Sequence, residues 1–464
     1  MKKLLILLSL VSNVAFAQLP QTLIEALKQA DIPQDSVAVY VQSVDGAAPS
    51  FSHNASKAMN AASVMKLVTT YTALEALTPA YRWKTEVYRE GELRRGVLNG
   101  NLMIKGYGDP SFKAQDFWRL LMSLQQAGVR EIKGDLVIDK SLFAKELSAR
   151  STFDDEIWRA YNALPSAFLV NGRSTSFKFS VEDGMVVVNQ EFELPQVRIV
   201  NNMKPTLGAC ADWRNYFRYN VNPKTEGVTV IFNGTYSVGC EERYLELSVL
   251  SDEQYAFYTF KKLWKEIGGK FSGKLQVREI PLTALKVLEQ HSEPLGYVVR
   301  DINKWSNNLM ARQLLLAMAI EKNSTLANEE DGSAVVKQVL SNKGLRFSEL
   351  VIENGAGLSR IERISAEHLG QMLTTAYNSA VMPEFIASLP ILALDGTVKK
   401  RLEYSAMQGN AHLKTGSLDG VSAVAGYVLD QHKRRYVLVM LVNHAKAAAS
   451  KGVQDALIQA VYFQ

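Results

Sequence analysis

Three short motifs, widely separated along the chain, constrain what it can fold into. They are Ser63-x-x-Lys66, Ser306-x-Asn308 and Lys414-Thr415-Gly416, and they occur in that order. Together they offer a serine nucleophile, a lysine base and polar groups for an acyl substrate. Roughly 240 residues separate Lys66 from Ser306, which is enough for a whole inserted domain. The fold must therefore bring three distant segments together and accommodate that insertion.

The pattern of apolar residues along the sequence changes twice, which indicates a discontinuous domain. Residues 18–82 and 283–464 combine long helical patterns with apolar strands, whereas residues 83–282 are dominated by short alternating stretches between Gly and Asn. The outer segments predict one α/β (α+β) domain. The middle segment predicts a β-rich insertion of two subdomains. Its short alternating stretches predict β-hairpins. The 464 residues also exceed what a single core usually supports.

Individual elements follow from hydrophobic periodicity. Helices are expected at 19–30, 61–77, 115–127, 253–267, 334–343, 366–377 and 445–462, and a helical pattern at 295–299 leads into another at 303–320. Strands are expected at 36–44, 421–429 and 435–443, and in the insertion at 85–89, 100–105, 135–139, 177–181, 198–200, 228–232 and 244–249. Asp183-Gly184 predicts a tight hairpin turn.

The N-terminal residues have the composition of a secretory signal peptide. Lys2 and Lys3 precede an apolar stretch, and Ala15-Phe16-Ala17 supplies the small residues of a cleavage site. An uncleaved membrane anchor is the alternative, although Asn13 interrupts an apolar run that is too short to span a bilayer. We therefore expect residues 1–17 to be a signal peptide and the mature chain to be exported, to the periplasm or the extracytoplasmic cell wall, without a transmembrane segment.

Charge, histidines and cysteines narrow the function classes. The net charge of +5 is mild and dispersed, which argues against a nucleic-acid partner. The six histidines lack the spacing of metal ligands, so we expect no metal and no cofactor. Cys210 and Cys240 suit one disulfide in an exported protein, with two unrelated buried thiols as the alternative.

Ser63 and Lys66 lie one helical turn apart, so their side chains share a face near the start of a helix. A serine hydroxyl is a weak nucleophile at neutral pH and needs an adjacent base. A lysine can be that base where burial and cationic neighbours lower its pKa. The apolar residues around the motif supply such burial, but a solvated helix start would show the same pattern, so this motif alone is a weak signal.

The second motif offers polar groups for proton transfer and substrate binding. Ser306 is a candidate for relaying a proton between Lys66 and the leaving group, and Asn308 offers both a donor and an acceptor to a substrate amide. A helix N-cap is the structural alternative for this segment.

The third motif precedes a predicted strand and suits an anionic substrate. Lys414 would provide a fixed positive charge for a substrate carboxylate and Thr415 a hydroxyl donor, while Gly416 would let the substrate backbone lie close to the strand edge. The backbone N–H of Ser417, with that of Ser63, would form an oxyanion hole.

With these motifs the chain resembles the serine penicillin-recognising enzymes. More narrowly, it is similar to the low-molecular-mass class C penicillin-binding proteins, the D-alanyl-D-alanine carboxypeptidase/endopeptidases. The similarity rests on the long insertion and on segments spread over nearly the whole chain, namely AASVMKLVTTYTALEAL (61–77), GNLMIKGYGDPSF (100–112), YNALPSAFLVNG (161–172), ENGAGLSR (353–360), LPILALDGTVKKRL (389–402) and HLKTGSLDGVSAVAGYV (412–428).

The resemblance implies both fold and activity. The expected fold is a serine β-lactamase/DD-peptidase-like domain, an antiparallel sheet flanked by helices, with a large β-rich insertion. The expected activity is hydrolysis of D-alanyl-D-alanine bonds in peptidoglycan stem peptides through an acyl-enzyme, as a carboxypeptidase and, on cross-links, as an endopeptidase. β-Lactams are expected to inhibit by acylating the same serine.

The resemblance also implies a role for each motif residue. Ser63 would be the acylated nucleophile and Lys66 its base. Ser306 and Asn308 would form the second motif of the family. Lys414 and Thr415 would bind the terminal carboxylate of the substrate. Asn307, where many relatives carry Asp, is a minor departure. Ala356 departs from the usual Gly-Ser-Gly and would remove one hydrogen bond behind the site.

Two other functions stay open at this point. A β-lactamase or an esterase of the same superfamily would use the same motifs, although nothing in that chemistry calls for an inserted domain of this size. A non-catalytic wall-binding scaffold would keep the fold with a vestigial site, which the intact motifs argue against.

Overall fold

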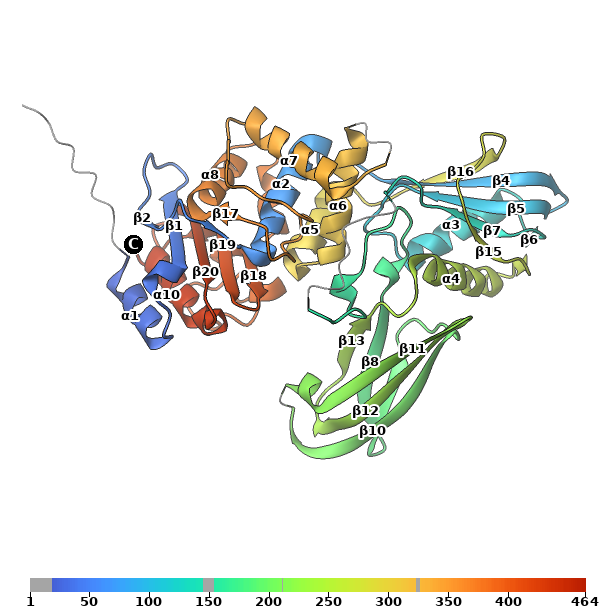
Figure 1. Ribbon diagram of the computed structural model, residues 1–464, viewed down its shortest axis with the longest axis horizontal. Coiled ribbons are helices and arrows are strands. Elements are labelled where there is room, and N and C mark those ends of the chain that lie inside the picture. Colours follow the sequence, from blue (N-terminus) through green and yellow to red (C-terminus); the bar gives the residue numbers. More distant parts are fainter. Residues whose placement is uncertain (1–18, 145–153, 211, 323–325) are drawn as a thin grey trace, which may run out of the picture.

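The computed structural model describes residues 19–144, 154–210, 212–322 and 326–464. The expected signal peptide, residues 1–17, lies outside these ranges. Within them, no helix is long and apolar enough to cross a membrane. Figure 1 shows one region built from both ends of the chain and a second region built from its middle.

The two ends of the chain share a sheet. In the described residues it has five strands, all antiparallel, in the order β18-β19-β20-β1-β2. These strands are β1 (Val37–Ser43), β2 (Phe51–His53), β18 (Ala411–Leu418), β19 (Val421–Leu429) and β20 (Arg435–Asn443). β1 pairs with β20 over its whole length, from Val37 opposite Val442 to Ser43 opposite Tyr436. The predicted α/β (α+β) class, an antiparallel sheet flanked by helices, is confirmed.

Helices cover both faces of this sheet, so its strands carry apolar side chains on both sides. Alternate residues of β1 enter different cores. Val37, Val39 and Val41 pack with α1 (Gln21–Gln29) and α10 (Lys451–Tyr462), whereas Ala38 and Tyr40 face the helical core on the other side. That core contains α2 (Lys66–Leu77), α5 (Leu295–Trp305), α6 (Asn308–Glu321), α7 (Glu329–Asn342), α8 (Ala366–Tyr377) and α9 (Met382–Ser388), with the short pair β3 (Ala58–Met59) and β17 (Ile364–Ser365).

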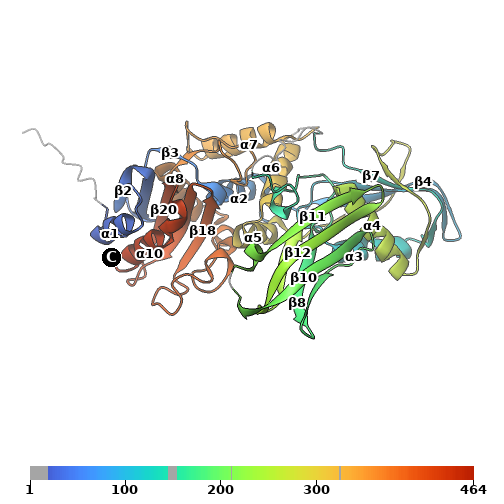
Figure 2. The same cartoon turned by 60° about the horizontal axis from the view of Figure 1, so that its bottom comes forward.

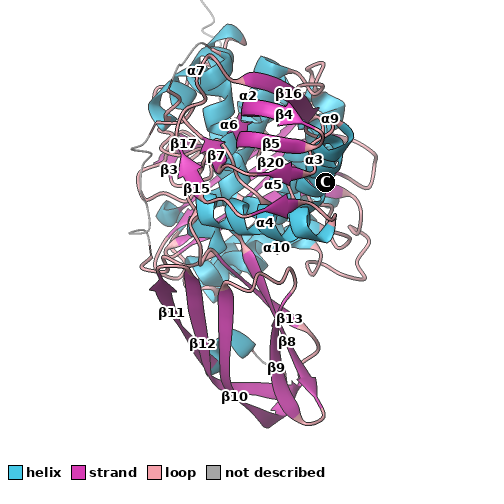
Figure 3. Cartoon of the chain, turned by 90° about the vertical axis from the view of Figure 1, so that its right-hand side faces the viewer, coloured by secondary structure: helices cyan, strands magenta, loops and turns pink. Residues whose placement is uncertain are grey.

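The middle of the chain forms two β-rich lobes (Figure 3). The first is a sheet covered by α3 (Ala114–Gln126) and α4 (Asp252–Glu266), whose strands in the described residues are β4 (Lys84–Arg94), β5 (Val97–Gly106), β6 (Glu131–Ile132), β7 (Leu136–Asp139), β14 (Lys270–Phe271), β15 (Leu275–Val277) and β16 (Leu285–His291). The second lobe contains two smaller sheets, β13-β8-β9 and β10-β12-β11, from β8 (Thr175–Glu182), β9 (Met185–Gln190), β10 (Val197–Ala209), β11 (Phe217–Lys224), β12 (Gly227–Gly239) and β13 (Arg243–Leu247).

Aromatic packing and a disulfide hold the second lobe together. The ring of Phe179 on β8 lies 5.3 Å from that of Phe217 and 5.2 Å from that of Phe232, on the other sheet. Cys210 and Cys240 form the expected disulfide, directly after β10 and β12. The two sheets therefore enclose one aromatic core between them.

The prediction of hairpins is correct for only part of the insertion. β4 with β5 and β8 with β9 are antiparallel hairpins, the latter turning at the predicted Asp183-Gly184. However, β10 pairs in parallel with β12, and β5 pairs in parallel with β6 and β7. A parallel pair needs a crossover, which α3 supplies after β5. Alternation within a strand carries no information on the direction of its partner, which is why the sequence suggested only hairpins.

A strand beyond residue 282, the expected end of the insertion, joins the sheet of the insertion. β16 pairs with β4, from Leu285 opposite Arg89 to His291 opposite Lys84, and so belongs to the sheet of the insertion. We therefore propose that the inserted region runs from about Lys84 to His291.

A buried glutamine docks the insertion onto α6. Gln313 is fully buried; its Oε1 accepts the N–H of Ser166 at 3.0 Å, and its Nε2 donates to the carbonyls of Ser166 at 3.0 Å and Gly108 at 3.3 Å. Beside it, Phe143 of the insertion packs in one apolar cluster with Leu316 of α6. Because α6 begins at the second motif, the insertion supports the helix that carries it.

We expect Gln313→Ala to lower the free energy of unfolding by about 2–4 kcal/mol, because it leaves buried backbone groups of Ser166 without partners. Thermal denaturation of the full chain measures the effect. The matched control is Gln338→Ala, which removes an exposed glutamine from α7. Equal melting temperatures for the two variants would contradict the docking role.

Candidate active site

The three motifs meet where α2, α5 and β18 come together (Figure 2). Ser63 lies in a single 3-10 turn, Ala62–Met65, and Lys66 is the first residue of α2. The expected helix 61–77 is therefore two elements, with Ala62 at a positive φ of 45° at the start of the turn. The Nζ of Lys66 and the Oγ of Ser63 are 2.9 Å apart. This places the hydroxyl and the amine within reach of direct proton transfer.

The surroundings of the Lys66 amine favour its neutral form. The residue is fully buried, and its Nζ donates to the side-chain Oδ1 of Asn308 at 2.6 Å and to the carbonyl of Ala356 at 2.5 Å. Burial, with the nearby charge of Lys414, holds the pKa of Lys66 well below its usual value, while Glu362 opposes this shift.

The hydrogen-bond partners also orient the lone pair of that amine. A neutral amine has two N–H groups and one lone pair, and two of its three partners, Asn308 Oδ1 and the Ala356 carbonyl, can only accept. In the neutral amine these two acceptors would take both N–H groups, which leaves the lone pair for the hydroxyl of Ser63 at 2.9 Å. This is the arrangement of a general base next to its nucleophile.

The second motif is a break between two helices. α5 ends at Trp305, Ser306 adopts the left-handed conformation with φ 58°, and the side chain of Asn307 caps α6 by accepting the N–H of Met310 at 3.0 Å. The expected helical pattern 303–320 is thus interrupted, because an N-cap needs non-helical backbone. The break sets Asn308 as the first residue of α6, where it contacts Lys66 and, at 3.5 Å, the carbonyl of Tyr161 from the insertion.

Lys414 of the third motif lies on the edge strand β18 and is fully buried. Its Nζ donates to the Oγ of Ser306 at 2.8 Å and to the carbonyl of Thr415 at 2.7 Å. Burial lowers the pKa of Lys414 to about 7. Burial thus opposes the positive charge expected for this amine, and an arriving carboxylate would favour the protonated form.

Gly416 lies against the turn that carries Ser63. A Cβ at this position would meet the carbonyl oxygen of Ala61 at 2.6 Å and the backbone nitrogens of Ser63 and Val64 at 2.9 Å and 3.0 Å. The absence of a Cβ thus allows β18 to lie directly against this turn. Ser417 follows on the same strand and is exposed.

Sequence reasoning missed the groups that hold these motifs in place. Thr397, in the short turn Gly396–Val398, accepts the hydroxyl of Thr415 at 2.8 Å. Next to it, Asp395 pairs with the buried Lys304 of α5 at 2.5 Å and accepts the N–H of Ile391 at 2.7 Å. The segment containing Asp395 and Thr397 was among those that carry the resemblance, which is the one signal that pointed to it.

Ala356 contributes its backbone carbonyl and N–H, which a sequence motif does not reveal. Its carbonyl contacts Lys66, and its N–H donates to the Oδ1 of Asn354 at 2.9 Å. The contact between the Ala356 carbonyl and Lys66 therefore does not need the hydroxyl of the serine that relatives carry at this position.

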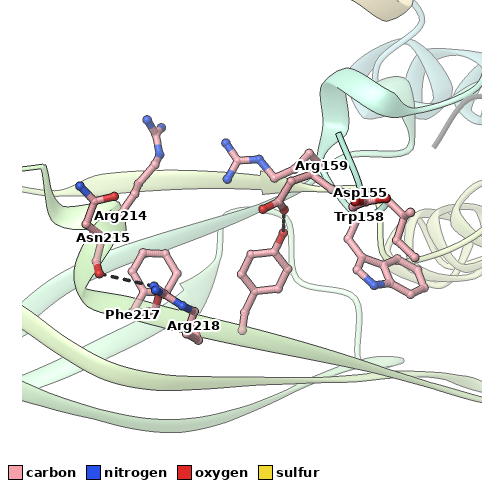
Figure 4. A pocket seen from close by; sticks show the side chains of 10 residues that line it. Asp155, Trp158, Arg159, Arg214, Asn215, Phe217 and Arg218 are labelled. Carbon is pink, nitrogen blue, oxygen red and sulfur yellow. Dashed lines mark hydrogen bonds between the residues drawn. The ribbon is translucent and has the colours of Figure 1, made fainter. Parts of the chain in front are cut away.

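A cavity of about 480 Å³ lies elsewhere, between residues 155–159 and β11 (Figure 4). Its lining includes the guanidinium groups of Arg159, Arg214 and Arg218 and the rings of Trp158 and Phe217. It contains no motif residue, so the chemistry of Ser63 is separate from this cavity. Among the described residues, no group of three or more His, Cys, Asp and Glu side chains is arranged to hold a metal ion.

We expect Gly416→Ala to slow acylation of Ser63 by a labelled penicillin by on the order of tenfold to a hundredfold, because the methyl group pushes β18 away from the nucleophile. Rates of labelling followed by gel fluorescence measure this. Gly452→Ala is the control, since a Cβ there meets open space on α10. Labelling of both variants at the wild-type rate would show that the contact between Gly416 and the Ser63 turn is unimportant.

Comparisons with known proteins agree with this geometry. The chain is 25% identical over 402 residues to the D-alanyl-D-alanine carboxypeptidase DacB of Haemophilus influenzae, an alignment that covers 84% of this chain and 82% of the relative. The crystal structure of penicillin binding protein 4 (dacB) from Haemophilus influenzae superimposes with a TM-score of 0.79 at 21% identity, over 95% of this chain and 99% of that one. The structure of the same protein complexed with a β-lactam gives 0.76 at 22% identity, over 96% and 100%.

The profile of one protein family covers almost the entire described chain. The match extends over residues 19–462, and so includes the insertion as well as all three motifs. The chain belongs to the D-Ala-D-Ala carboxypeptidase 3 (S13) family.

Proposed function

We propose that the protein is a serine DD-peptidase that hydrolyses D-alanyl-D-alanine bonds of peptidoglycan stem peptides through an acyl-enzyme on Ser63. The observation that carries this proposal is the buried Lys66 amine 2.9 Å from the hydroxyl of Ser63, with two oxygen acceptors as its other partners. Membership of the D-Ala-D-Ala carboxypeptidase family supports the choice of bond. Carboxypeptidase and endopeptidase activity use the same residues and differ in the leaving group, a free D-alanine or a cross-linked peptide.

Acylation begins with proton transfer to the base. Lys66 takes the proton of Ser63 while the serine oxygen attacks the carbonyl carbon of the penultimate D-alanine. The resulting oxyanion accepts from the backbone N–H groups of Ser63 and Ser417. This assignment is supported by the close packing of β18 against the Ser63 turn, where a Cβ on Gly416 would lie 2.9 Å from the Ser63 nitrogen, and by the place of β18 at the sheet edge.

The collapse of this intermediate needs a proton for the leaving amine. The proton held by Lys66 passes to that amine through the hydroxyl of Ser306, the C–N bond breaks, and D-alanine leaves with the acyl group esterified to Ser63. Water then attacks the ester with Lys66 again as base, which restores Ser63. The side-chain amide of Asn308 holds the amide of the substrate, since its Nδ2 makes a long 3.5 Å contact to the carbonyl of Tyr161 and no other hydrogen bond within the described part of the chain.

The carboxylate of the terminal D-alanine binds the protonated Lys414 and the hydroxyl of Thr415. β-Lactams carry a carboxylate and a strained amide in a similar arrangement, so they acylate Ser63 and block it. The alternatives receive less support. A scaffold would not need a desolvated lysine beside a serine, and a β-lactamase or esterase would not need the insertion.

The site of action is proposed from the sequence of the N-terminus. Residues 1–17 have the features of a signal peptide, and peptidoglycan lies outside the cytoplasmic membrane. We infer export to the periplasm or the extracytoplasmic cell wall, where the Cys210–Cys240 disulfide is stable.

Purified muropeptides test the function. We expect release of D-alanine from pentapeptides, and separation of cross-linked dimers if the enzyme is also an endopeptidase, both lost in Ser63→Ala. Lys66→Arg should lose at least about a thousandfold in acylation, because arginine cannot act as a base near neutral pH. Lys57→Arg is the control, because Lys57 is an exposed lysine outside the site. Rapid penicillin hydrolysis without D-alanine release would instead identify a β-lactamase.

The titration of Lys414 predicts how substrate binding depends on pH. Its protonated form binds the carboxylate, and this form is lost as pH rises through about 7. We therefore expect the KM of an acyl-D-Ala-D-Ala peptide to rise by up to about tenfold from pH 6 to pH 8. The same peptide with a C-terminal amide should show no such rise in steady-state assays. A parallel rise for both peptides would place the titration elsewhere.

A further inference from the structure

Glu362 is a buried carboxylate that the proposed mechanism does not use. It is 1% exposed, and its Oε1 accepts three backbone N–H groups of one loop, those of Glu353 at 3.0 Å, Asn354 at 2.9 Å and Gly355 at 3.2 Å. Its own N–H donates to the Oγ of Ser359 at 3.0 Å. The second oxygen, Oε2, is buried and accepts no hydrogen bond from the described residues. One carboxylate oxygen thus holds three consecutive peptide units.

The opposite side of the same loop faces the catalytic helix. The carbonyl of Gly355 accepts the hydroxyl of Thr69 at 2.7 Å, and the carbonyl of Ala356 accepts the amine of Lys66 at 2.5 Å. A Cβ at Gly357, where φ is 77°, would lie 1.9 Å from the carbonyl oxygen of Ala62. The loop therefore has no room to move toward the Ser63 turn, and Glu362 prevents it from moving away.

Glu362 also acts on Lys66 through charge. Burial raises the pKa of the Glu362 carboxyl, and its three N–H donors oppose that rise. Of the charged groups around Lys66, Lys414 from β18 disfavours the protonated amine and Glu362 favours it. The negative charge of the nearby Glu353 raises the pKa of Glu362 further. The carboxylate thereby limits how far burial and Lys414 shift the pKa of the base.

We infer that Glu362 is a positioning residue for acylation, which orients the Lys66 amine through the loop 353–358 and sets the pH range in which that amine accepts the proton of Ser63. This inference rests on the proposed function of Ser63 and Lys66. It assigns two separable effects to one side chain, the position of the Ala356 carbonyl and the negative charge beside the amine.

Two substitutions separate these effects. Glu362→Gln keeps an oxygen acceptor and the size of the side chain but removes the charge, whereas Glu362→Asp keeps the charge and withdraws the acceptor by one methylene. Glu367→Gln is the control, since it neutralises a half-buried carboxylate in α8 outside the loop. The measurement is the rate of acylation by a fluorescent penicillin from pH 5 to pH 9, with intact-mass analysis and thermal unfolding of each variant.

The acylation rate should rise with pH as Lys66 loses its proton. Without the negative charge the protonated amine is less favoured, so we expect the acid limb of Glu362→Gln to move to lower pH by about 0.5–1 unit. In Glu362→Asp the limb should stay in place while the rate falls by about tenfold or more at every pH. Glu367→Gln should match the wild type.

An unshifted acid limb in a folded Glu362→Gln variant overturns the inference, and so does an equal shift in Glu367→Gln. If Glu362→Gln does not fold, a wild-type rate at all pH values in Glu362→Asp overturns it. These outcomes differ from failure of the proposed function, in which the wild type is not labelled on Ser63 or Lys66→Arg is labelled at the normal rate.

Discussion

The desolvated amine of Lys66 is the group on which the arrangement of the site depends. Among the described residues its hydrogen-bond partners are one hydroxyl and two amide-type oxygens, none of which carries a charge. A buried amine without a counter-ion in direct contact favours the neutral state, and only the neutral state can take a proton from Ser63. The two acceptors come from α6 and from the loop 353–358. Whatever fixes these two segments therefore also fixes the direction of the lone pair.

The insertion takes part in that support. Its backbone is hydrogen-bonded to Gln313 in the middle of α6, and the carbonyl of its Tyr161 borders Asn308 at the start of the same helix. A change in how the insertion packs on α6 would displace Asn308, whose side chain accepts a hydrogen bond from the Lys66 amine. It would thereby change the position of that amine relative to the hydroxyl of Ser63. The inserted region thus helps to hold α6 and Asn308 in place next to Lys66, although it supplies none of the three motifs.

Much of the fold and the main residues of the site could be predicted from the sequence. Strands buried on both faces leave uninterrupted apolar runs, so 421–429 and 435–443 match β19 and β20, and the amphipathic pattern 366–377 matches α8. Ser63, Lys66, Ser306, Asn308 and Lys414 could be proposed from the sequence because their chemistry resides in their side chains, and the fold brings these side chains together. The Ala356 carbonyl was missed because every residue has one. Strand direction in the insertion was missed because it depends on crossovers, and the lowered pKa of Lys414 because it depends on burial by residues distant in sequence.

The pairing of β1 with β20 has a consequence for how the chain reaches its folded state. Val37 lies opposite Val442, so the central sheet joins the first and last parts of the chain and cannot form until nearly all of it is available. The inserted lobes are made of contiguous residues and need no such wait. As the chain emerges from its amino end, the lobes are able to fold first, and β18 with Lys414 arrives among the last segments. The three motifs therefore come together only when the last strands of the sheet are in place.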